Sequence, residues 1–432
     1  MKTSLYWFRN DLRVADLEGL TEACRADRVR AVYFFDPRCF ERDANGFPRT
    51  GKFRARFLIE TIEDLKKQLH ERGIPFFIYC DRPEEVLPGL VERLGIDQLH
   101  SQREWTRDET RISEALRNKL PDRVAWVEHF DQFLFHPDDI PFDSYSKIPE
   151  VFTRFRKACE KQARVRDCLP PPEKRPANEW TEPEVNLPDL QALGLEPFDP
   201  DPRSAFPFGG GSTAAWERLQ SYFWEEQRLS YYKKTRNGLL GPEYSSKFSP
   251  WLANGALSAR QVFQQVRKYE REVHRNQDTY WLIFELIWRD YFKYISLKHG
   301  DRIFHSTGIR PGPYDWHRSK AALEAWTRGR TANDFVNANM IELAQTGWMS
   351  NRGRQNVASY WSKELGQDWR IGAAWFESLL LDYDVHSNWG NWMYNSGVGN
   401  DPRDRKFNPS LQAERYDPGG RFRRLWLQPS LF

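Results

Sequence analysis

Short apolar runs alternate with amphipathic stretches along the first 130 residues of this 432-residue chain. The apolar runs predict strands at residues 5–8, 31–35, 76–80, 98–101 and 124–127. Between the runs, the 3.6-residue period of helices covers residues 16–26, 51–71, 83–94 and 107–120. Because strands that alternate with helices usually pair in parallel, we expect a Rossmann-like α/β sheet covered on both faces.

The pattern changes after residue 130. A helical period covers residues 148–162, and residues 169–207 contain ten prolines, which exclude a regular helix or a central strand. From residue 212 the helical period continues nearly to the end, and the tail at 402–432 is expected to be coil. The predicted organisation is an α/β domain, a linker and an all-α domain, at residues 1–130, 131–207 and 208–432.

Glycine-rich segments point to no clear phosphate site. No G-x-G-x-x-G or Walker A motif follows the first strand, so the usual nucleotide sites are absent from the N-terminal domain. A glycine run at residues 209–211 precedes Ser212 and Thr213. It could cradle a phosphate, but a Ser212 or Thr213 side chain that caps the next helix explains the pattern better.

Tryptophan is unusually abundant. The chain has 18 Trp, and thirteen of them lie between Trp216 and Trp392. Because a buried indole N–H needs an acceptor, this clustering suggests stacking or redox chemistry in addition to core packing.

Charge and cysteine content indicate which kinds of ligand and which cellular compartment fit this sequence. Net charge is only +3, but residues 228–275 carry ten Lys or Arg against three Glu, which predicts a phosphate-binding face or, alternatively, a solvated helix surface. Five scattered cysteines without metal-ligand spacing fit reduced thiols. Neither a signal peptide nor a membrane span is evident, so we expect a cytoplasmic protein without a metal site.

The segment from Asp382 to Trp392 is the densest in chemistry. If it is helical, Asp384, Asn388 and Trp392 share one face. Acid, amide and indole together suit a polar heterocycle that exchanges electrons. The alternative is a capped helix that packs two aromatic side chains into a core.

A second stripe, formed by Trp281, Glu285, Trp288 and Phe292, also follows helical spacing. A carboxylate between two indoles is costly to bury unless it binds a ligand, and the combination suits a nucleobase. The alternative is a simple ion pair between Glu285 and Arg289, one turn apart.

Two further clusters suit an anionic ligand. Trp348, Asn351 and Gln355 share a predicted helical face, and Arg354 beside them needs a carboxylate, for which Asp382 is the candidate. Hydroxyl groups and main-chain amides cluster at residues 244–249 before a helix, which suits a pyrophosphate, although serine before a helix is more often only a cap.

Taken together, these segments resemble the photolyase/cryptochrome family, and its DASH cryptochrome branch most of all. The resemblance rests on YWFRNDLR (6–13), YKKTRNG (232–238), SKFSPW (246–251), FELIWR (284–289), GWMSNR (347–352) and DVHSNWGNW (384–392). It implies FAD in the helical domain. The positions that match its contacts are Tyr232, Ser245, Ser246, Lys247, Phe248, Ser249, Glu285, Arg289, Trp348, Asn351, Arg354, Asp382, Asp384 and Asn388.

The resemblance also implies roles for these residues. Turn 245–249 would hold the diphosphate, and Asn388 would face flavin N5. Trp392, Trp369 and Trp316 match an electron relay, in that order from flavin to surface. On the DNA side, the matching residues are Arg236, Glu285, Trp288, Asn351, Gln355 and Tyr394. Of these, Glu285 and Asn351 would take part in splitting the lesion.

Two positions depart from the ordinary photolyase pattern, which has Met at Gln355 and Trp at Tyr394. A more polar pocket would stack a flipped lesion less well, so single-stranded substrate is favoured. Asp108 or Glu109 lies where the family binds an antenna, usually methenyltetrahydrofolate. Acids stabilised at a helix N-terminus are the alternative, and another antenna or none remains open.

The sequence therefore predicts an FAD-dependent carbon–carbon lyase that uses blue light to repair cyclobutane pyrimidine dimers, preferably in single-stranded DNA. RNA is a second candidate partner, and a monomer is expected. The main alternative is a blue-light photoreceptor that binds nucleic acid without repair. A flavin electron carrier is less well supported, because it would leave the lesion pocket unused.

Overall fold

Five strands form one parallel sheet in the computed structural model, which describes residues 1–176 and 187–428. The strands are β1 (Thr3–Trp7), β2 (Arg28–Phe34), β3 (Phe76–Tyr79), β4 (Gln98–Gln102) and β5 (Ala125–His129). Their order is β3-β2-β1-β4-β5, and Tyr6 of the central strand pairs with Ala31 and His100. The parallel α/β fold predicted for this part is confirmed.

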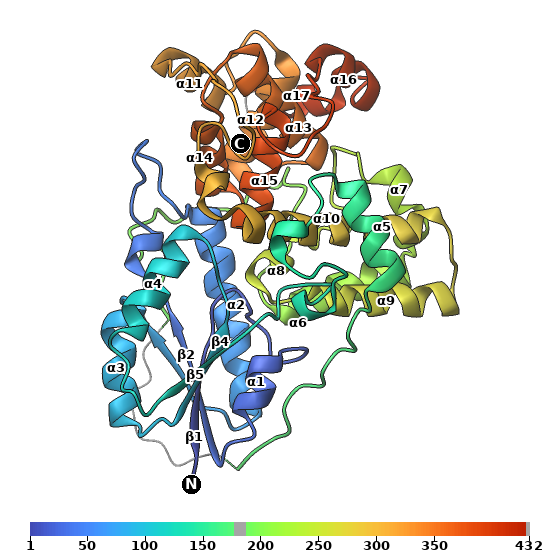
Figure 1. Ribbon diagram of the computed structural model, residues 1–432. Helices are drawn as coiled ribbons and strands as arrows, with labels where there is room; N and C mark the ends of the chain where they lie inside the picture. The colour runs from blue at the N-terminus through green and yellow to red at the C-terminus, as the bar shows by residue number, and fades with distance from the viewer. Residues whose placement is uncertain (177–186, 429–432) are drawn as a thin grey trace.

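Alternating residues of the strands point into two separate cores. Tyr6 packs with Leu20 and Ile62 on one face, whereas Trp7 packs with Leu87 and Leu116 on the other. The covering helices are α1 (Glu18–Ala23), α2 (Lys52–Glu71), α3 (Pro83–Arg93) and α4 (Arg107–Arg117). Figure 1 shows them on both sides of the sheet.

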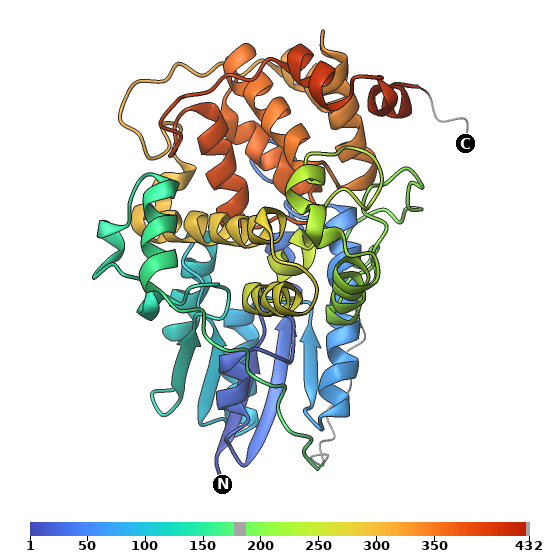
Figure 2. The same ribbon diagram turned by 90° about the vertical axis from the view of Figure 1, so that its right-hand side faces the viewer.

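The rest of the described chain is helical. Its helices are α5 (Phe152–Gln162), α6 (Ser212–Gln220), α7 (Tyr232–Thr235), α8 (Ser249–Asn254), α9 (Ala259–Glu272), α10 (Gln277–His299), α11 (Lys320–Thr327), α12 (Asp334–Thr346), α13 (Asn351–Ser359), α14 (Trp369–Leu379), α15 (Val385–Ser396), α16 (Pro409–Tyr416) and α17 (Arg421–Leu427). The long α10 contacts α5, α7, α9 and α15, and it lies between the sheet and the C-terminal helices (Figures 1 and 2).

Three local predictions are wrong. Helix α6 begins at Ser212 after Gly211, which has φ +96° and donates its N–H to Thr61, so neither Ser212 nor Thr213 is the cap. The tail is not coil, because α16 and α17 form there. Trp348 precedes α13 instead of lying on it, since Gly347 ends α12 in a left-handed conformation.

The domain limits predicted at residues 130 and 207 stay a prediction. Residues 177–186 of the predicted linker lie outside the described residues. Across residues 1–176 and 187–428, no helix combines the length and apolarity that crossing a membrane requires.

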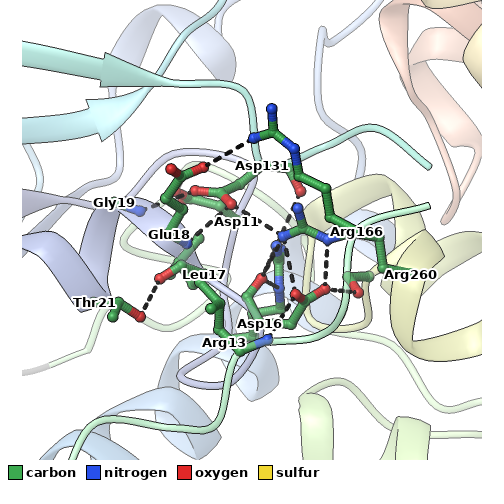
Figure 3. A network of polar contacts seen from close by, with 12 residues as sticks. Asp11, Arg13, Asp16, Leu17, Glu18, Gly19, Thr21, Asp131, Arg166 and Arg260 are labelled. Carbon is green, nitrogen blue, oxygen red and sulfur yellow. Dashed lines mark hydrogen bonds and ion pairs between the residues drawn. The ribbon is translucent and has the colours of Figure 1, made fainter. Parts of the chain in front are cut away.

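A buried ionic network joins the sheet to the helical part (Figure 3). Arg260 on α9 lies 3.0 Å from Asp16 and 3.2 Å from Asp131, measured from Nη2 to Oδ1. Arg13 donates to the main-chain carbonyls of Asp16, Asp131 and Gly255. Asp131 in turn accepts from the first amides of α1. All four charged side chains are almost fully buried, so each depends on the others for its charge to be tolerated.

We expect Arg260→Ala to lower the unfolding free energy by about 3–5 kcal/mol, because it leaves buried carboxylates without their cation. Thermal and urea unfolding of the purified protein measures the loss. The control is Arg271→Ala, an exposed residue on the same helix. Equal stabilities of the two variants would contradict the role given to this network.

Candidate functional site

A deep cavity lies in the helical part, between α7, α8, α10 and the segments that precede α13 and α15. Its walls are formed by Tyr232, Arg236, Tyr244, Ser245, Ser246, Lys247, Phe248, Ser249, Leu252, Ala253, Leu282, Glu285, Leu286, Arg289, Trp348, Met349, Asn351, Arg354, Asp382, Asp384 and Ser387. Every residue that the sequence predicted as a cofactor contact lies on this wall except Asn388. The structure thus brings together segments more than 150 residues apart.

Three ion pairs fix charged side chains around this cavity. Arg354 pairs with Asp382 at 2.9 Å, as predicted from the sequence. Glu285 pairs with Arg236 at 2.7 Å. The alternative pairing of Glu285 is not what forms, because Arg289 donates instead to the carbonyl oxygens of Gln132 and Leu252.

The third pair joins Asp384 to Lys293 at 2.9 Å. Asp384 is the N-cap of α15 and not part of its helical face, since its side chain accepts from the Ser387 amide. Burial opposes ionisation, but the charges of Lys293 and His386 hold the pKa of Asp384 below its usual range. Sequence reasoning missed Lys293, although it lies two turns after Glu285 on the same face of α10.

The turn at residues 244–249 carries an unusual buried lysine. Lys247 has a left-handed backbone, with φ +65°, and its Nζ lies 3.2 Å from the centre of the Tyr244 ring and 4.5 Å from that of Trp348. In the described part of the chain, this Nζ has no hydrogen-bond partner. Burial lowers the pKa of Lys247 well below its usual value.

Glu342 on α12 is a buried acidic residue on the same side of the site. It is 1% exposed, and neither carboxyl oxygen has a hydrogen-bond partner among the described residues. Burial raises the pKa of Glu342 to about 8, against the opposing effects of Lys247 and Arg354. The sequence offered no signal for Glu342, because its spacing matches the buried face of an ordinary helix.

Asn388 lies one turn into α15 and is buried. Its Nδ2 donates to the Ala373 carbonyl of α14 at 3.0 Å, and among the described residues the cavity wall is formed by its neighbour Ser387 instead. The amide is therefore held firmly, with its orientation set by α14. Its role beside a flavin stays a prediction.

Two members of the predicted relay, Trp369 and Trp392, lie on α14 and α15, which pack against each other, and the relay itself stays a prediction. Trp392 is buried, and its ring fills the space beside Gly372, where a Cβ would lie 2.2 Å from the indole. Trp369 begins α14 one turn before Gly372 and is fully buried. Trp369 and half-buried Trp316 both donate their indole N–H to the Ser306 carbonyl at 3.0 Å, so the two indole N–H groups share one acceptor.

The predicted lesion pocket is only partly assembled. Glu285 and Asn351 line the cavity, and Gln355 accepts from Arg352 at 2.8 Å. Trp288 meets the edge of Tyr394 at 5.8 Å, but Phe152 of α5 stacks on its face at 3.7 Å and 11°. Sequence reasoning missed Phe152, which comes from a distant helix and covers a surface that a base was expected to use.

The predicted antenna acids already have partners. Both lie in the first turn of α4, where Asp108 pairs with Arg49 at 2.5 Å and Glu109 accepts from the Thr106 hydroxyl. These contacts suit a helix N-terminus. An antenna at this position stays a prediction.

Glu342 predicts a measurable pH effect. The folded protein keeps this carboxyl protonated up to about pH 8, whereas an unfolded chain loses the proton at about pH 4. Folding therefore takes up a proton in this window, and the Glu342 contribution to stability falls as pH rises through it, by up to ~1.4 kcal/mol per pH unit. Glu342→Gln should flatten the pH dependence and stabilise the protein above neutral pH.

Urea unfolding from pH 5 to pH 8 measures this effect. The control is Glu414→Gln, an exposed position on α16. If the unfolding free energies of Glu342→Gln and wild type change with pH in the same way, Glu342 is ionised in the folded protein. The conclusion that its carboxyl is protonated there would then be wrong.

Comparison with known proteins agrees with the prediction that this cavity binds FAD. The family model described as DNA photolyase matches residues 4–177, and the FAD binding domain of DNA photolyase matches residues 281–431. Cryptochrome DASH of Gloeobacter violaceus is 49% identical over 429 residues, which cover 99% of this chain and 85% of the relative.

Two solved structures have the same fold. The cryptochrome of Synechocystis sp. PCC6803 matches with a TM-score of 0.94 and 42% identity, over 99% of this chain and 89% of its own. A class III photolyase of Agrobacterium tumefaciens matches with a TM-score of 0.83 and 27% identity, over 99% and 86% of the two chains. The chain therefore belongs to the photolyase/cryptochrome family, in its cryptochrome DASH branch, and its cofactor is FAD.

Proposed function

We propose that this protein uses light to repair cyclobutane pyrimidine dimers, with a preference for single-stranded DNA. One observation carries the proposal above all. The cavity of an FAD-binding domain is lined by an acid and an amide, Glu285 and Asn351, whose polar groups suit recognition of a nucleobase. A protein that only stored electrons would not need base-recognising groups on that wall.

The cavity residues fit FAD. Buried polar atoms without partners in the described chain, such as Lys247 Nζ, lie at a wall that also carries Arg354 and the hydroxyls of turn 245–249. When bound in its reduced form, FAD would supply the electron that opens the dimer ring. The Arg354–Asp382 and Lys293–Asp384 pairs would hold the flavin end through charges that are already oriented and need no reorganisation.

Glu285 would recognise the thymine edge. Burial raises the pKa of Glu285, and Arg236 opposes that rise. The carboxyl can therefore donate a hydrogen bond to a carbonyl oxygen when protonated, or accept one from N3–H when ionised. Arg236 lies in the basic segment 228–275 and would contact the adjacent phosphate while it keeps Glu285 oriented.

The preference for single strands follows from poor stacking. Phe152 occupies one face of Trp288, and Tyr394 presents a smaller ring than tryptophan. Base–aromatic stacking contributes ~1–3 kcal/mol per base. Extruding a base from a duplex costs roughly a few kcal/mol. The weak stacking that these side chains offer therefore does not offset the free energy of extruding the lesion from a duplex. A lesion in a single strand does not have to be extruded. RNA is a second candidate partner for the same reason.

A photoreceptor is the second candidate function. It is favoured by the neighbouring indoles of Trp369 and Trp316, which suit electron entry from the surface, and by the cryptochrome name of the relatives. Both functions would use FAD and the relay. Only the light-dependent repair of a DNA lesion distinguishes a photolyase from a photoreceptor. An antenna near Asp108 and Glu109, methenyltetrahydrofolate being the family's usual one, would serve either function.

Repair should be observed when the reduced holoprotein is illuminated with a single-stranded oligonucleotide that contains one thymine dimer. The same lesion in a matched duplex should be repaired at least tenfold more slowly, because a penalty of ~1.4 kcal/mol already gives a factor of ten. Chromatography of the products measures both rates. Absence of repair on either substrate by FAD-loaded protein would exclude the lyase and leave the photoreceptor.

Gln355→Met with Tyr394→Trp should raise duplex repair toward the single-strand rate, because a larger aromatic platform restores roughly 1–3 kcal/mol of stacking. The single variants separate the two contributions. Trp216→Phe, an exposed substitution on α6, serves as the control. An unchanged ratio of single-strand to duplex rates in the double variant would refute the stacking argument.

A further inference from the structure

Trp369, the middle residue of the predicted relay, has an aromatic neighbour that is not part of the relay. The ring of Trp389 on α15 lies 5.6 Å from that of Trp369, at an interplanar angle of 77°. Trp389 is half-buried and packs edge-on against Phe304 at 4.9 Å. The middle member of the relay is thus in ring contact with a residue that the relay does not use.

Trp389 is also in hydrogen-bond contact with a tyrosine, Tyr383. Its indole Nε1 donates to the hydroxyl of Tyr383 at 3.4 Å, and the carboxyl of Glu377 on α14 is close enough to this phenol that each group affects the pKa of the other. A phenol that faces an indole on one side and a carboxylate on the other has a route for an electron and a separate route for its proton. These three side chains therefore have the arrangement of a redox-active tyrosine.

The surrounding charges favour this chemistry. The Arg54 guanidinium lies 4.6 Å from the centre of the Tyr383 ring, so a positive charge left on the phenol would be repelled. Arg49 lies 3.7 Å from Glu377 and, together with Arg54, favours the ionised carboxylate. Burial raises the pKa of Glu377, as does the nearby Glu109, so this carboxylate is a stronger base than an exposed one.

We propose that Trp389 and Tyr383 form a second branch of the electron relay, which ends in proton-coupled oxidation of Tyr383 with Glu377 as the proton acceptor. The branch rests on the proposed relay through Trp392 and Trp369. It leads to the side of α14 and α15 that faces Arg49 and Arg54 of the N-terminal part, whereas the other branch ends at Trp316.

The electrons and protons balance. The Trp369 radical cation, supplied by the relay in light, takes one electron from Trp389. The Trp389 cation then takes one electron from Tyr383, whose phenolic O–H bond breaks as the proton moves to a carboxylate oxygen of Glu377. The products are neutral Trp369, neutral Trp389, a neutral tyrosyl radical and a neutral carboxylic acid.

The test uses the FAD-loaded protein and compares Trp316→Phe, Trp389→Phe and the double variant. FAD content is measured first, so that a folding or loading defect is recognised. Photoreduction is followed by absorbance with an external thiol, and radicals are trapped in light and identified by electron paramagnetic resonance. Protein grown with deuterated tyrosine identifies a tyrosyl signal by its narrowed line. Trp375→Phe, a half-buried position on α14 whose ring contacts Phe47, is the matched control.

We expect Trp316→Phe to keep part of the photoreduction and the double variant to lose it. The tyrosyl signal should be present in wild type, absent in Tyr383→Phe and Trp389→Phe, and formed about 100-fold more slowly in Glu377→Gln, which lacks the base. If Trp316→Phe alone abolishes photoreduction, or no tyrosyl signal forms, the relay stands and the branch is wrong. If Trp392→Phe photoreduces like wild type, the relay itself is wrong and the branch falls with it.

Discussion

The geometry of the cavity depends on charges that neither part of the molecule could bury alone. Arg260 of α9 needs Asp16 and Asp131 from the N-terminal part, because an unpaired charge in a dry interior costs several kcal/mol. Nearby, α10 extends the same connection. Arg289 joins the carbonyls of Gln132 and Leu252, and Asp290 accepts the amides of residues 134 and 135. The cavity wall on α10 is therefore positioned by the sheet-bearing part.

The same electrostatic reasoning separates two kinds of cavity residue. Arg354 and Lys293 are paired with carboxylates, so their orientation is already set before a ligand arrives. Lys247 and Glu342 are buried without hydrogen bonds among the described residues and with pKa values shifted toward their neutral forms. Such groups store unfavourable free energy that a polar ligand can relieve, which is typical of functional sites and not of core packing.

The number of tryptophans in the sequence does not reveal the role of each one. Trp288 was expected as an open stacking surface, but Phe152 covers one of its faces. Trp389 had no role of its own in the sequence analysis, yet its ring contacts Trp369 and its N–H reaches Tyr383. Stacking platform, core residue and redox relay differ only in which neighbours surround the same side chain.

The sequence by itself determined most element types, the parallel sheet, the family and most of the polar residues of the cavity wall, because periodicity and local motifs depend on neighbouring residues. It also predicted the Arg354–Asp382 pair, since a buried guanidinium needs a carboxylate. Only the tertiary structure decided the Arg236–Glu285 and Lys293–Asp384 pairs, the position of Phe152 over Trp288 and the Trp389–Tyr383–Glu377 arrangement. It also decided that the Glu342 carboxyl has no hydrogen-bond partner among the described residues. Each of these depends on which distant segments meet in space, and helical spacing does not encode that choice.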